Sequence, residues 1–370
     1  MNGQWIGRFG GTTSGQIILN VDDCGDWYQG TAFLLQDDNS IANSLVGFST
    51  ITKKNEFKFT TKNITALNRW PGLPITIDQM QTEFPHSQLP EFVEVEGKWT
   101  ESNLVLNWKS NLTIGNCNLK KPKANTKSKI SSKKVTWDSF KRAVAKLENR
   151  RFIFRGQQEP WRLRTSFHRT NRTNIQRFIN DDIRVLHRHL SARTKHTFNL
   201  EIPNENGAFF NLVQHHGYPT PLLDWTLSPY VAAFFAFRNI SKDAVIKAEK
   251  TNKVRIIMFD QDAWRNDYTQ LVHLSTGILH FSMSEFLAIE NERMIPQQAV
   301  SAITNIDDIE TYIQQCEKKN GKKYLYAFDL PLSERDKVVQ ELRYMGITAG
   351  SLFPGLDGAC EELKNRNFDL

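Results

Sequence analysis

The sequence feature that most constrains the fold of this chain is the segment at residues 214–237, QHHGYPTPLLDWTLSPYVAAFFAF. An apolar helix is predicted over residues 207–216, and the glycine and two prolines that follow prevent it from continuing. Residues 222–225 then predict a short buried strand. Ser228 and the proline after it predict the start of an almost wholly apolar helix over residues 230–237. A helix, a tight loop, a strand and a buried helix in this order are typical of the wall of a binding site.

Asp224 lies inside the predicted strand, where its neighbours Leu223 and Trp225 are apolar. A buried carboxylate without a partner costs several kcal/mol or more, so this charge must be paired or used. The residues alone leave two roles open. Asp224 can steady positive charge that develops in a reaction, or it can pair with Arg155 or His216 and orient them.

The composition is that of a soluble globular protein with room for two domains. The chain has 370 residues, of which 39% are hydrophobic and 24% are charged. No apolar run is long enough for a membrane span, and the first residues do not resemble a signal peptide. The four cysteines lack the spacing of a zinc site, so we expect reduced thiols, no metal and a cytoplasmic location.

A lysine-rich stretch divides the chain. Lys+Arg minus Asp+Glu is 47 − 40 = +7, and seven lysines lie in LKKPKANTKSKISSKK without an acidic residue between them: Lys120, Lys121, Lys123, Lys127, Lys129, Lys133 and Lys134. This polar composition, interrupted by Pro122, predicts a flexible linker over residues 119–135. A tail that grips nucleic-acid phosphates is the alternative, and the absence of interleaved aromatic residues favours the linker.

Residues 1–118 predict a small antiparallel β domain, either a barrel or a sandwich. The expected strands are residues 16–21, 27–35, 44–52, 56–61, 92–100 and 103–110, and the opening residues suit a strand that closes the sheet. Asp22, Asp23 and Asp26 form an acidic segment, for which ordinary turn chemistry is favoured over a bound cation. We expect this domain to recognise a partner, either a nucleic acid or a neutralising protein.

Residues 136–365 predict an α+β domain. Helices are expected at residues 136–150 and 334–345, and strands at 152–155, 254–259 and 324–329. Strands and helices are mixed without regular βαβ alternation, which favours α+β over a doubly wound sheet. The sequence contains no P-loop, no dinucleotide-binding GxGxxG and no GxSxG, which argues against the enzyme classes that these motifs mark.

Four blocks of this second region resemble the FRG domain family in their residues and in their order. They are FRGQ at residues 154–157, QHHGYPTPLLDWT at 214–226, Asn291-x-Arg293 with Gln297-Gln298, and LFPGLDG at 352–358. The resemblance covers about residues 136–363. One departure is Ala299, which stands where the family usually has glycine.

FRG domains resemble the ADP-ribosyltransferase superfamily, and this resemblance implies an ADP-ribosyltransferase-like fold that takes NAD as substrate. Related transferases use an arginine or histidine on an early strand, a strand–helix element with small hydroxyl residues, and a later Glu or Gln near the ribose. By this resemblance Arg155, Asp224, Gln297 and Gln298 are the catalytic candidates. The implied NAD contacts are Arg155, Gly156, His216, Tyr218, Trp225, Thr226 and Ser228. Residues about 70 positions on either side should therefore converge on residues 224–228.

Several of these residues also have structural explanations. Arg155 can be half of a buried ion pair, although Gly156 after it would permit close approach of a ligand. A histidine at a helix end can form hydrogen bonds with the last carbonyl groups of the helix. We prefer this structural role for His215, whereas for His216 the structural role and a role in the site are equally favoured. Trp225 can pack in the core or stack on a ligand, and Tyr218 can likewise serve in packing or in stacking. Because a glutamine cannot accept a proton as a carboxylate can, Glu292 or Glu285 are alternative acids.

Residues 150–195 contain eleven arginines and one lysine against three acids. Arginine recognises phosphate through paired hydrogen bonds, so this zone suits a phosphate-rich partner as well as a solvated helix face. We expect transfer of ADP-ribose from NAD to a macromolecule, with RNA or single-stranded DNA preferred over protein. A toxin of anti-phage defence, neutralised by an antitoxin, fits this expectation. The alternatives are a non-catalytic nucleotide- or nucleic-acid-binding module and a metal-dependent nuclease that uses His216 and Asp224.

Overall fold

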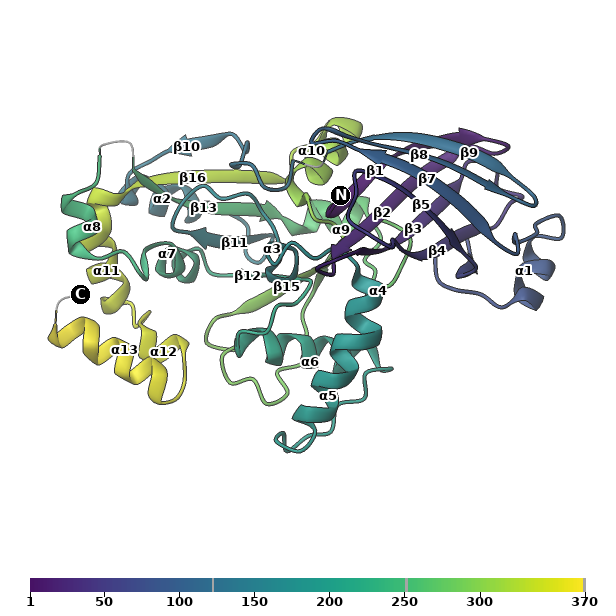
Figure 1. Ribbon diagram of the computed structural model, residues 1–370. Coiled ribbons are helices and arrows are strands. Elements are labelled where there is room, and N and C mark those ends of the chain that lie inside the picture. The colour runs from purple at the N-terminus through teal and green to yellow at the C-terminus, as the bar shows by residue number, and fades with distance from the viewer. Residues whose placement is uncertain (122, 250–251, 369–370) are drawn as a thin grey trace.

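The computed structural model describes residues 1–121, 123–249 and 252–368 and shows an α+β protein built on two β-sheets (Figure 1). The two sheets belong to the two regions that the sequence distinguishes. Within the residues described, no helix is long and apolar enough to cross a membrane.

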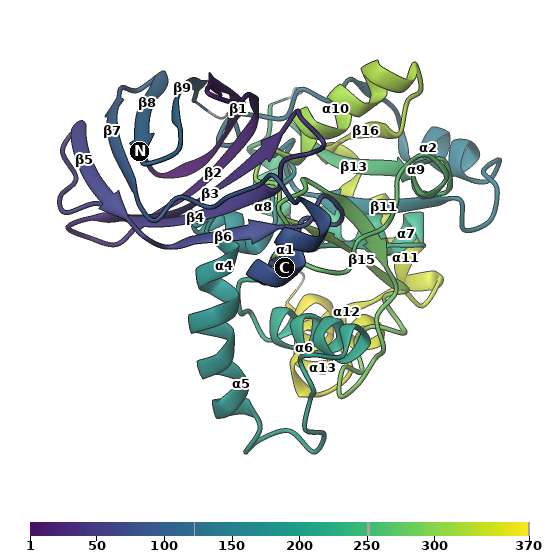
Figure 2. The same ribbon diagram turned by 90° about the vertical axis from the view of Figure 1, so that its right-hand side faces the viewer.

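The N-terminal sheet is antiparallel and curls into a nearly closed barrel (Figure 2). Its strands, in the described part of the chain, are β1 (Gly3–Gly11), β2 (Gly15–Asp23), β3 (Tyr28–Gln36), β4 (Asn43–Ser49), β5 (Glu56–Thr61), β6 (Ile64–Leu67), β7 (Val93–Trp99), β8 (Asn103–Ser110) and β9 (Ile114–Lys120), in the order β5-β7-β8-β9-β1-β2-β3-β4-β6. The hydroxyl of Thr61 on β5 donates to the carbonyl oxygen of Gly47 on β4 over 2.6 Å. This contact joins the end strand β5 to β4, the neighbour of the other end strand β6, so the sheet is barrel-like, as the first of the two alternatives predicts.

The second sheet is mixed and has the order β10-β16-β13-β11-β12-β15-β14. Its strands are β10 (Ser132–Lys134), β11 (Phe152–Gln157), β12 (Leu222–Thr226), β13 (Lys253–Asp260), β14 (Phe281–Ser284), β15 (Ala299–Thr304) and β16 (Leu325–Pro331). Only the pair β10–β16 is parallel among the described pairings. The expected α+β class is therefore confirmed, whereas the finer ADP-ribosyltransferase-like description rests on resemblance alone.

Helices cover both faces of the second sheet. One core joins α2 (Trp137–Val144), α7 (Pro229–Phe237) and α11 (Arg335–Tyr344) to one face. A second core joins α9 (Gln261–Asp267) and α10 (Ile309–Asn320) to the other face. The remaining helical segments are α1 (Ile77–Glu83), α3 (Ser166–Arg169), α4 (Ile175–Arg177), a π-helical turn (Phe178–Ile183), α5 (Arg184–Leu190), α6 (Pro203–His215), α8 (Lys242–Ile246), a 3-10 turn (Leu332–Glu334), α12 (Ala349–Leu352) and α13 (Leu356–Asn367).

The arm formed by α4, the π-helical turn and α5 projects from the body of the molecule beside α6 (Figures 1 and 2). The sequence predicts one helix over residues 174–191, and the structure has one continuous helical stretch from Ile175 to Leu190 with the π-helical turn in its middle. Phe178 and Ile183 within the turn are buried against α6. Arg184 and Arg188 of α5 are exposed, whereas Arg177 of α4 is half-buried and contacts Cys24.

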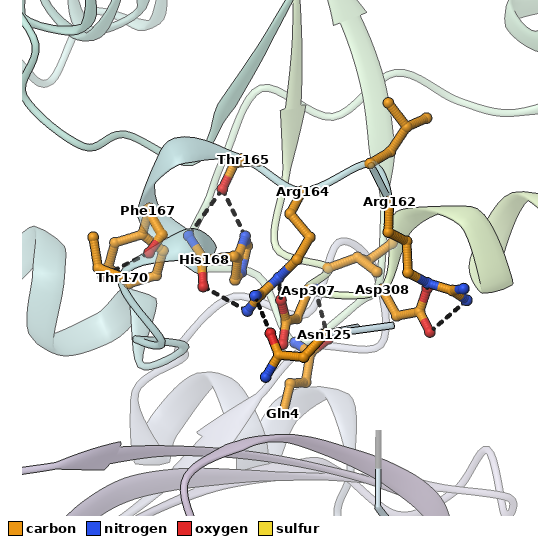
Figure 3. Close-up of polar contacts among 12 residues, drawn as sticks. Gln4, Asn125, Arg162, Arg164, Thr165, Phe167, His168, Thr170, Asp307 and Asp308 are labelled. Atoms are coloured by element: carbon orange, nitrogen blue, oxygen red, sulfur yellow. Dashed lines mark hydrogen bonds and ion pairs between the residues drawn. The ribbon is translucent and has the colours of Figure 1, made fainter. Parts of the chain in front are cut away.

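The lysine-rich segment at residues 119–135 is not a free tether, which corrects the expectation of a flexible linker. Its seven lysines are all exposed, but Ala124 and Ile130 between them are buried, and β10 pairs with β16 of the second sheet. The side chain of Asn125 accepts a hydrogen bond from Arg164 (Figure 3). The overall composition averages exposed lysines with buried apolar residues, so it does not reveal the residues that attach the segment to the protein. Pro122 lies outside the described residues.

Asp22 joins the two regions of the chain. Its side chain is fully buried and accepts hydrogen bonds from the backbone N–H groups of Thr173 (2.7 Å) and Asn174 (3.0 Å) and from Nε of Arg172 (2.9 Å). The turn chemistry that the sequence suggests belongs instead to Asp23, whose carboxylate accepts from the N–H of Gly25. Asp22 therefore fixes the β domain to the start of the arm.

A second group of polar contacts at the junction centres on Arg164 (Figure 3). Its Nε lies 2.7 Å from Oδ1 of Asp307, and the backbone N–H of Asp307 donates to Oε1 of Gln4 on β1 over 3.0 Å. Arg164 also donates to the carbonyl oxygen of His168. Burial, together with the nearby Arg164 charge, lowers the pKa of His168 to about 3. The imidazole of the folded protein is therefore neutral near pH 7.

Replacing Asp22 tests the junction. We expect Asp22→Ala to lower the free energy of unfolding by about 3–5 kcal/mol, because two buried backbone N–H groups and the Arg172 cation lose their acceptor. Urea unfolding followed by tryptophan fluorescence measures this. Asp37→Ala is the control, since Asp37 forms an exposed pair with Arg8 in the same domain and its loss should leave stability almost unchanged. Equal effects of the two substitutions would contradict the role given to Asp22.

The neutral His168 predicts a pH-dependent stability. Its folded pKa lies below the ordinary value of about 6.5, so its contribution to stability is complete above pH ~6.5 and is lost as the pH falls towards 3. Between pH 7.5 and 5.0 the stability difference between wild type and His168→Gln should shrink by about 2 kcal/mol. Urea unfolding of both proteins at the two pH values measures this difference, and a difference that stays constant would mean that His168 is not held neutral.

Candidate functional site

The segments singled out in the sequence meet where the second sheet is interrupted. Strands β11 and β12 form a single residue pair, Phe154 opposite Thr226, whereas β12 pairs with β15 over its whole length. Beyond Phe154 the two strands part. There Nη1 of Arg155 donates to the carbonyl oxygen of Asp224 over 2.5 Å, which supplies the donor that a continued ladder would have provided.

The expected convergence on residues 224–228 is confirmed. Arg155 reaches Asp224 from 69 positions before it. On the other side, the hydroxyl of Thr226 donates to the carbonyl oxygen of Gln297 over 2.7 Å, across 71 positions. The three sequence blocks thus form one site although they are far apart in the chain.

A cavity of about 440 Å³ opens at this interruption of the sheet. It is lined by residues from β11, β12, α6, α7, the loop before β15 and the segment after α12: Phe154, Arg155, Gly156, Gln157, Gln158, Trp161, Arg169, Gln214, His215, Asp224, Trp225, Thr226, Phe235, Arg238, Arg293, Gln297, Ala299 and Phe353. Four of these residues are arginines, and Asp224 is the only acidic residue among those that the structure places in the wall. The cavity is therefore strongly cationic, with aromatic side chains beside the charges.

Asp224 is held without a cation. Its Oδ1 accepts a hydrogen bond from Nε2 of Gln214, and Gln214 in turn accepts one from the hydroxyl of Thr220. No nitrogen of Arg155 or His216 lies within 4.0 Å of the carboxylate in the described structure. The carboxylate of Asp224 therefore forms no direct ion pair with either residue, and Arg155 bonds the backbone carbonyl of Asp224 instead.

The four arginines differ in the hydrogen bonds and ion pairs that they already form within the protein. Arg155 is half-buried, its buried Nε has no hydrogen-bond partner among the described residues, and desolvation with the nearby Arg169 charge lowers its pKa to about 10. It is still a cation at neutral pH. Arg293 donates to the carbonyl oxygen of His215 over 3.0 Å, and Arg238 is paired with Glu361.

Arg169 is exposed at the cavity. No carboxylate lies within 4.0 Å of it in the part of the chain that the structure describes. Burial of part of the side chain and the charge of Arg164 lower its pKa. A guanidinium in this situation gains from an anionic ligand, because the ligand would relieve the repulsion between neighbouring cations.

Some residues that the sequence put forward lie outside the cavity wall. His216 and Gln298 are exposed and face away from it, and Gln298 has a left-handed backbone with φ of 48°. Tyr218 packs against Phe178 at the base of the arm. Ser228 serves as N-cap of α7, where its hydroxyl accepts from the N–H of Val231. None of these four residues lines the cavity.

Two further assignments change. Trp225 lies in the wall but is only 3% exposed and packs against Phe259, so it belongs to the core. Gly156 does not make room for a ligand. A Cβ at this position would lie 1.9 Å from the carbonyl oxygen of Ala232 and 2.6 Å from the nitrogen of Ala236, so the glycine lets α7 approach the sheet.

Several residues of the cavity wall are not predicted from the sequence. His215 lines the cavity in place of His216, because α6 ends there with its last turn facing the sheet. Its Nδ1 contacts the side-chain amide of Asn291, and burial lowers its pKa. The spacing of Asn291 and Arg293 offered a signal for this pair. No local signal marks Arg169.

Trp161 supplies exposed aromatic surface at the cavity, whereas Phe353 is buried in the wall. Trp161 is 45% exposed, and the ring of Phe353 lies 3.9 Å from the guanidinium carbon of Arg238. The alternative acids do not reach the wall, since Glu285 pairs with Arg150 on the surface and Glu292 is exposed outside the wall. Within residues 1–121, 123–249 and 252–368, no group of three or more His, Cys, Asp or Glu side chains is arranged to hold a metal ion.

Adding one methyl group to Gly156 tests the contact that shapes the cavity. We expect Gly156→Ala to lower the free energy of unfolding by about 3 kcal/mol or more, because the new Cβ overlaps the α7 backbone. Gly10→Ala is the matched control, since a Cβ there meets nothing within 4 Å. Urea unfolding of both variants measures the difference, and a tolerated Gly156→Ala would show that α7 can shift freely.

Comparison with known protein families identifies the part of the chain that carries this site. Residues 150–244 match the FRG domain, which includes β11, α6, β12 and α7 together with Arg155, Arg169, His215 and Asp224. Arg293, Gln297 and Phe353 lie outside the matched residues. No curated protein and no solved structure matches the chain. The four sequence blocks, their convergence at one cavity and the match together identify this chain as a protein with an FRG domain.

Proposed function

We propose that the cavity binds NAD and that the protein transfers its ADP-ribose to a macromolecule, preferably RNA or single-stranded DNA. The observation that carries this proposal is the charge arrangement, in which four arginines and aromatic side chains surround one carboxylate without a cationic partner. NAD has the complementary pattern: a pyrophosphate, two flat rings and a cationic nicotinamide. The likeness of FRG domains to ADP-ribosyltransferases supports the same activity.

Arg169 and Arg293 are the side chains that we assign to the pyrophosphate. Neither has a carboxylate within 4.0 Å among the described residues, so both can turn their charge to phosphate oxygens. Arg155 lies deeper and adds positive charge below them while holding the backbone of Asp224. Trp161 offers an exposed plane on which a ring can stack.

Asp224 is assigned to the nicotinamide ribose. The bond between C1′ and the nicotinamide nitrogen breaks, nicotinamide leaves with the bonding electrons, and positive charge develops on the ribose. A carboxylate that Gln214 already orients can stabilise this charge without reorganisation. Gln297 donates its Nε2 to the carbonyl oxygen of Leu352, which leaves its Oε1 to accept from a ribose hydroxyl.

The acceptor nucleophile then bonds to C1′ and gives up a proton. His215 is the candidate base, since it lines the cavity and burial lowers its pKa, which keeps the imidazole neutral at neutral pH. No step in this sequence uses a metal. A neutralising antitoxin would act on this protein by covering the cavity mouth.

The preference for a nucleic-acid acceptor rests on the projecting arm. Its exposed cations are Arg184 and Arg188, and two more, Arg193 and Lys195, follow directly after α5. None of the four has a carboxylate within 4.0 Å in the described structure. The arm stands beside α6, whose last residue is His215 (Figure 1). A phosphate backbone bound along the arm would lead towards the cavity.

Incubation with NAD labelled in its adenylate, together with RNA and single-stranded DNA oligonucleotides, tests the proposal. We expect label on the nucleic acid and an equal amount of released nicotinamide. Asp224→Asn should lower both by roughly 10²-fold or more, because the shape is kept while the charge is lost. Arg169→Gln should chiefly raise the KM for NAD. Arg142→Gln, on an exposed face of α2, is the control that should change neither.

The same experiment distinguishes the alternatives. NAD binding without nicotinamide release would indicate a non-catalytic module. Cleavage of the oligonucleotides without NAD, dependent on a divalent cation, would indicate a nuclease. Label on protein in place of nucleic acid would support ADP-ribose transfer but would identify the acceptor as protein. Full activity of Asp224→Asn would show that the site is assigned wrongly.

A further inference from the structure

We propose that the N-terminal barrel encloses a binding site for a small, neutral and mainly apolar molecule that carries one hydrogen-bond donor. This site is separate from the cationic cavity and does not depend on the function proposed for it. The observation behind it is a hollow of about 160 Å³ inside the barrel.

The barrel interior is filled at one end and hollow at the other. At the filled end Trp5, Val21 and Leu104 are each at most 2% exposed. At the other end, inward-facing Leu34 and Val46 line the hollow and keep accessible surface although they point into the barrel. Apolar side chains that face an unfilled interior have contacts to gain from an apolar ligand.

Aromatic side chains form a wall of the hollow. The rings of Phe48 and Phe59 stack at 5.1 Å, and Phe57 and Phe59 stack at 6.0 Å. The indole of Trp108 lies on the wall beside Phe9, with ring centroids 5.9 Å apart. Flat faces of this kind suit a ligand with one or two rings.

The wall contains no charged side chain. None of the lining residues that the structure describes is Asp, Glu, Lys, Arg or His. Met1 also lines the hollow, and burial together with the Lys121 charge lowers the pKa of its amino group to about 5, so that this group is neutral near pH 7. An ionised ligand would lose its hydration without gaining a partner there, which selects for neutral molecules.

Six polar residues line the hollow: Thr13, Gln36, Ser44, Ser87, Gln88 and Thr113. Among the described residues of the wall, Gln36 is the one with a buried side-chain atom, its Oε1, that lacks a hydrogen-bond partner. An unpartnered buried acceptor is costly, and an O–H or N–H group of a ligand would satisfy it. The ligand class therefore has one donor on an otherwise apolar body.

The size of the hollow sets the size of the ligand. An engineered apolar cavity of about 150 Å³ in another protein accepts benzene, and the hollow here has about 160 Å³. Two fused rings that reach into the open end of the hollow are near the upper limit, so naphthalene derivatives are suitable probes.

Three naphthalenes that differ at one position test the proposal on the full chain. The probes are 2-naphthol, which is neutral and has one donor, 2-methoxynaphthalene, which is neutral and has none, and 2-naphthoate, which is charged. Fluorescence titration and calorimetry should show saturable binding of 2-naphthol at one site. We expect 2-naphthoate to bind at least about tenfold more weakly, because its charge finds no partner.

Two substitutions locate the site. Val46→Phe adds volume inside the hollow on β4 and should weaken 2-naphthol at least about tenfold. Val105→Phe is the matched control, because Val105 is exposed on the outer face of β8, and it should leave binding unchanged. Thermal melts check that both variants are folded.

Gln36→Leu separates the polar contact from packing. It should weaken 2-naphthol roughly fivefold and leave 2-methoxynaphthalene within twofold. Absence of saturable 2-naphthol binding, equal weakening by Val46→Phe and Val105→Phe, or equal binding of the charged probe would each overturn the proposal. Loss of both neutral probes in Gln36→Leu would overturn the role of its Oε1.

Discussion

The close approach of α7 to β11 is the contact on which the candidate site depends. Gly156 has no side chain, so the backbone of α7 lies against the strand where any Cβ would collide with it. The helix begins directly after β12, capped by Ser228, and it carries Phe235 and Arg238 to the cavity wall. A side chain at residue 156 would lift this helix and move both residues. The FRG tripeptide thus contributes its arginine to the cavity and its glycine to the packing behind it.

The second organising interaction is the attachment of the β domain. Asp22 takes three donors from the start of the arm, and Arg164, Asp307 and Gln4 form a polar chain beside it. Both groups are buried, so each depends on complete pairing. The barrel is consequently part of the same structure as the FRG domain and orients the arm that we assign to the acceptor.

The sequence predicted the elements of the site better than its individual side chains. Strand β12, the capped helix α7 and the convergence of Arg155 with residues 224–228 follow from local patterns of apolar residues, caps and motif order. The orientation of the side chains at the end of α6 does not follow from such local patterns. His215 and His216 are adjacent, and only the angle at which the helix meets the sheet decides that the first faces the cavity. Arg169 could not be found in advance, because it reaches the wall through the fold of a short loop helix.

Composition failed where neighbouring residues have opposite roles. In the segment at residues 119–135 the lysines are exposed while Ala124 and Ile130 are buried, so an average over the stretch predicted a tether. Asp22 and Asp23 show the same effect at a strand end. One carboxylate is buried against another part of the chain and the other makes a surface turn, and nothing in their immediate sequence separates them.

The parting of β11 and β12 has an evolutionary consequence. The cavity exists because two neighbouring strands give up ladder hydrogen bonds that a continuous sheet would have formed, so the fold is less stable here than its strand content would allow. Substitutions that rejoin the strands would be favoured by selection for stability alone and would fill the cavity as they did so. If the cavity has the proposed function, selection has to preserve this interruption of the sheet, and relatives without that function should show the repaired sheet first.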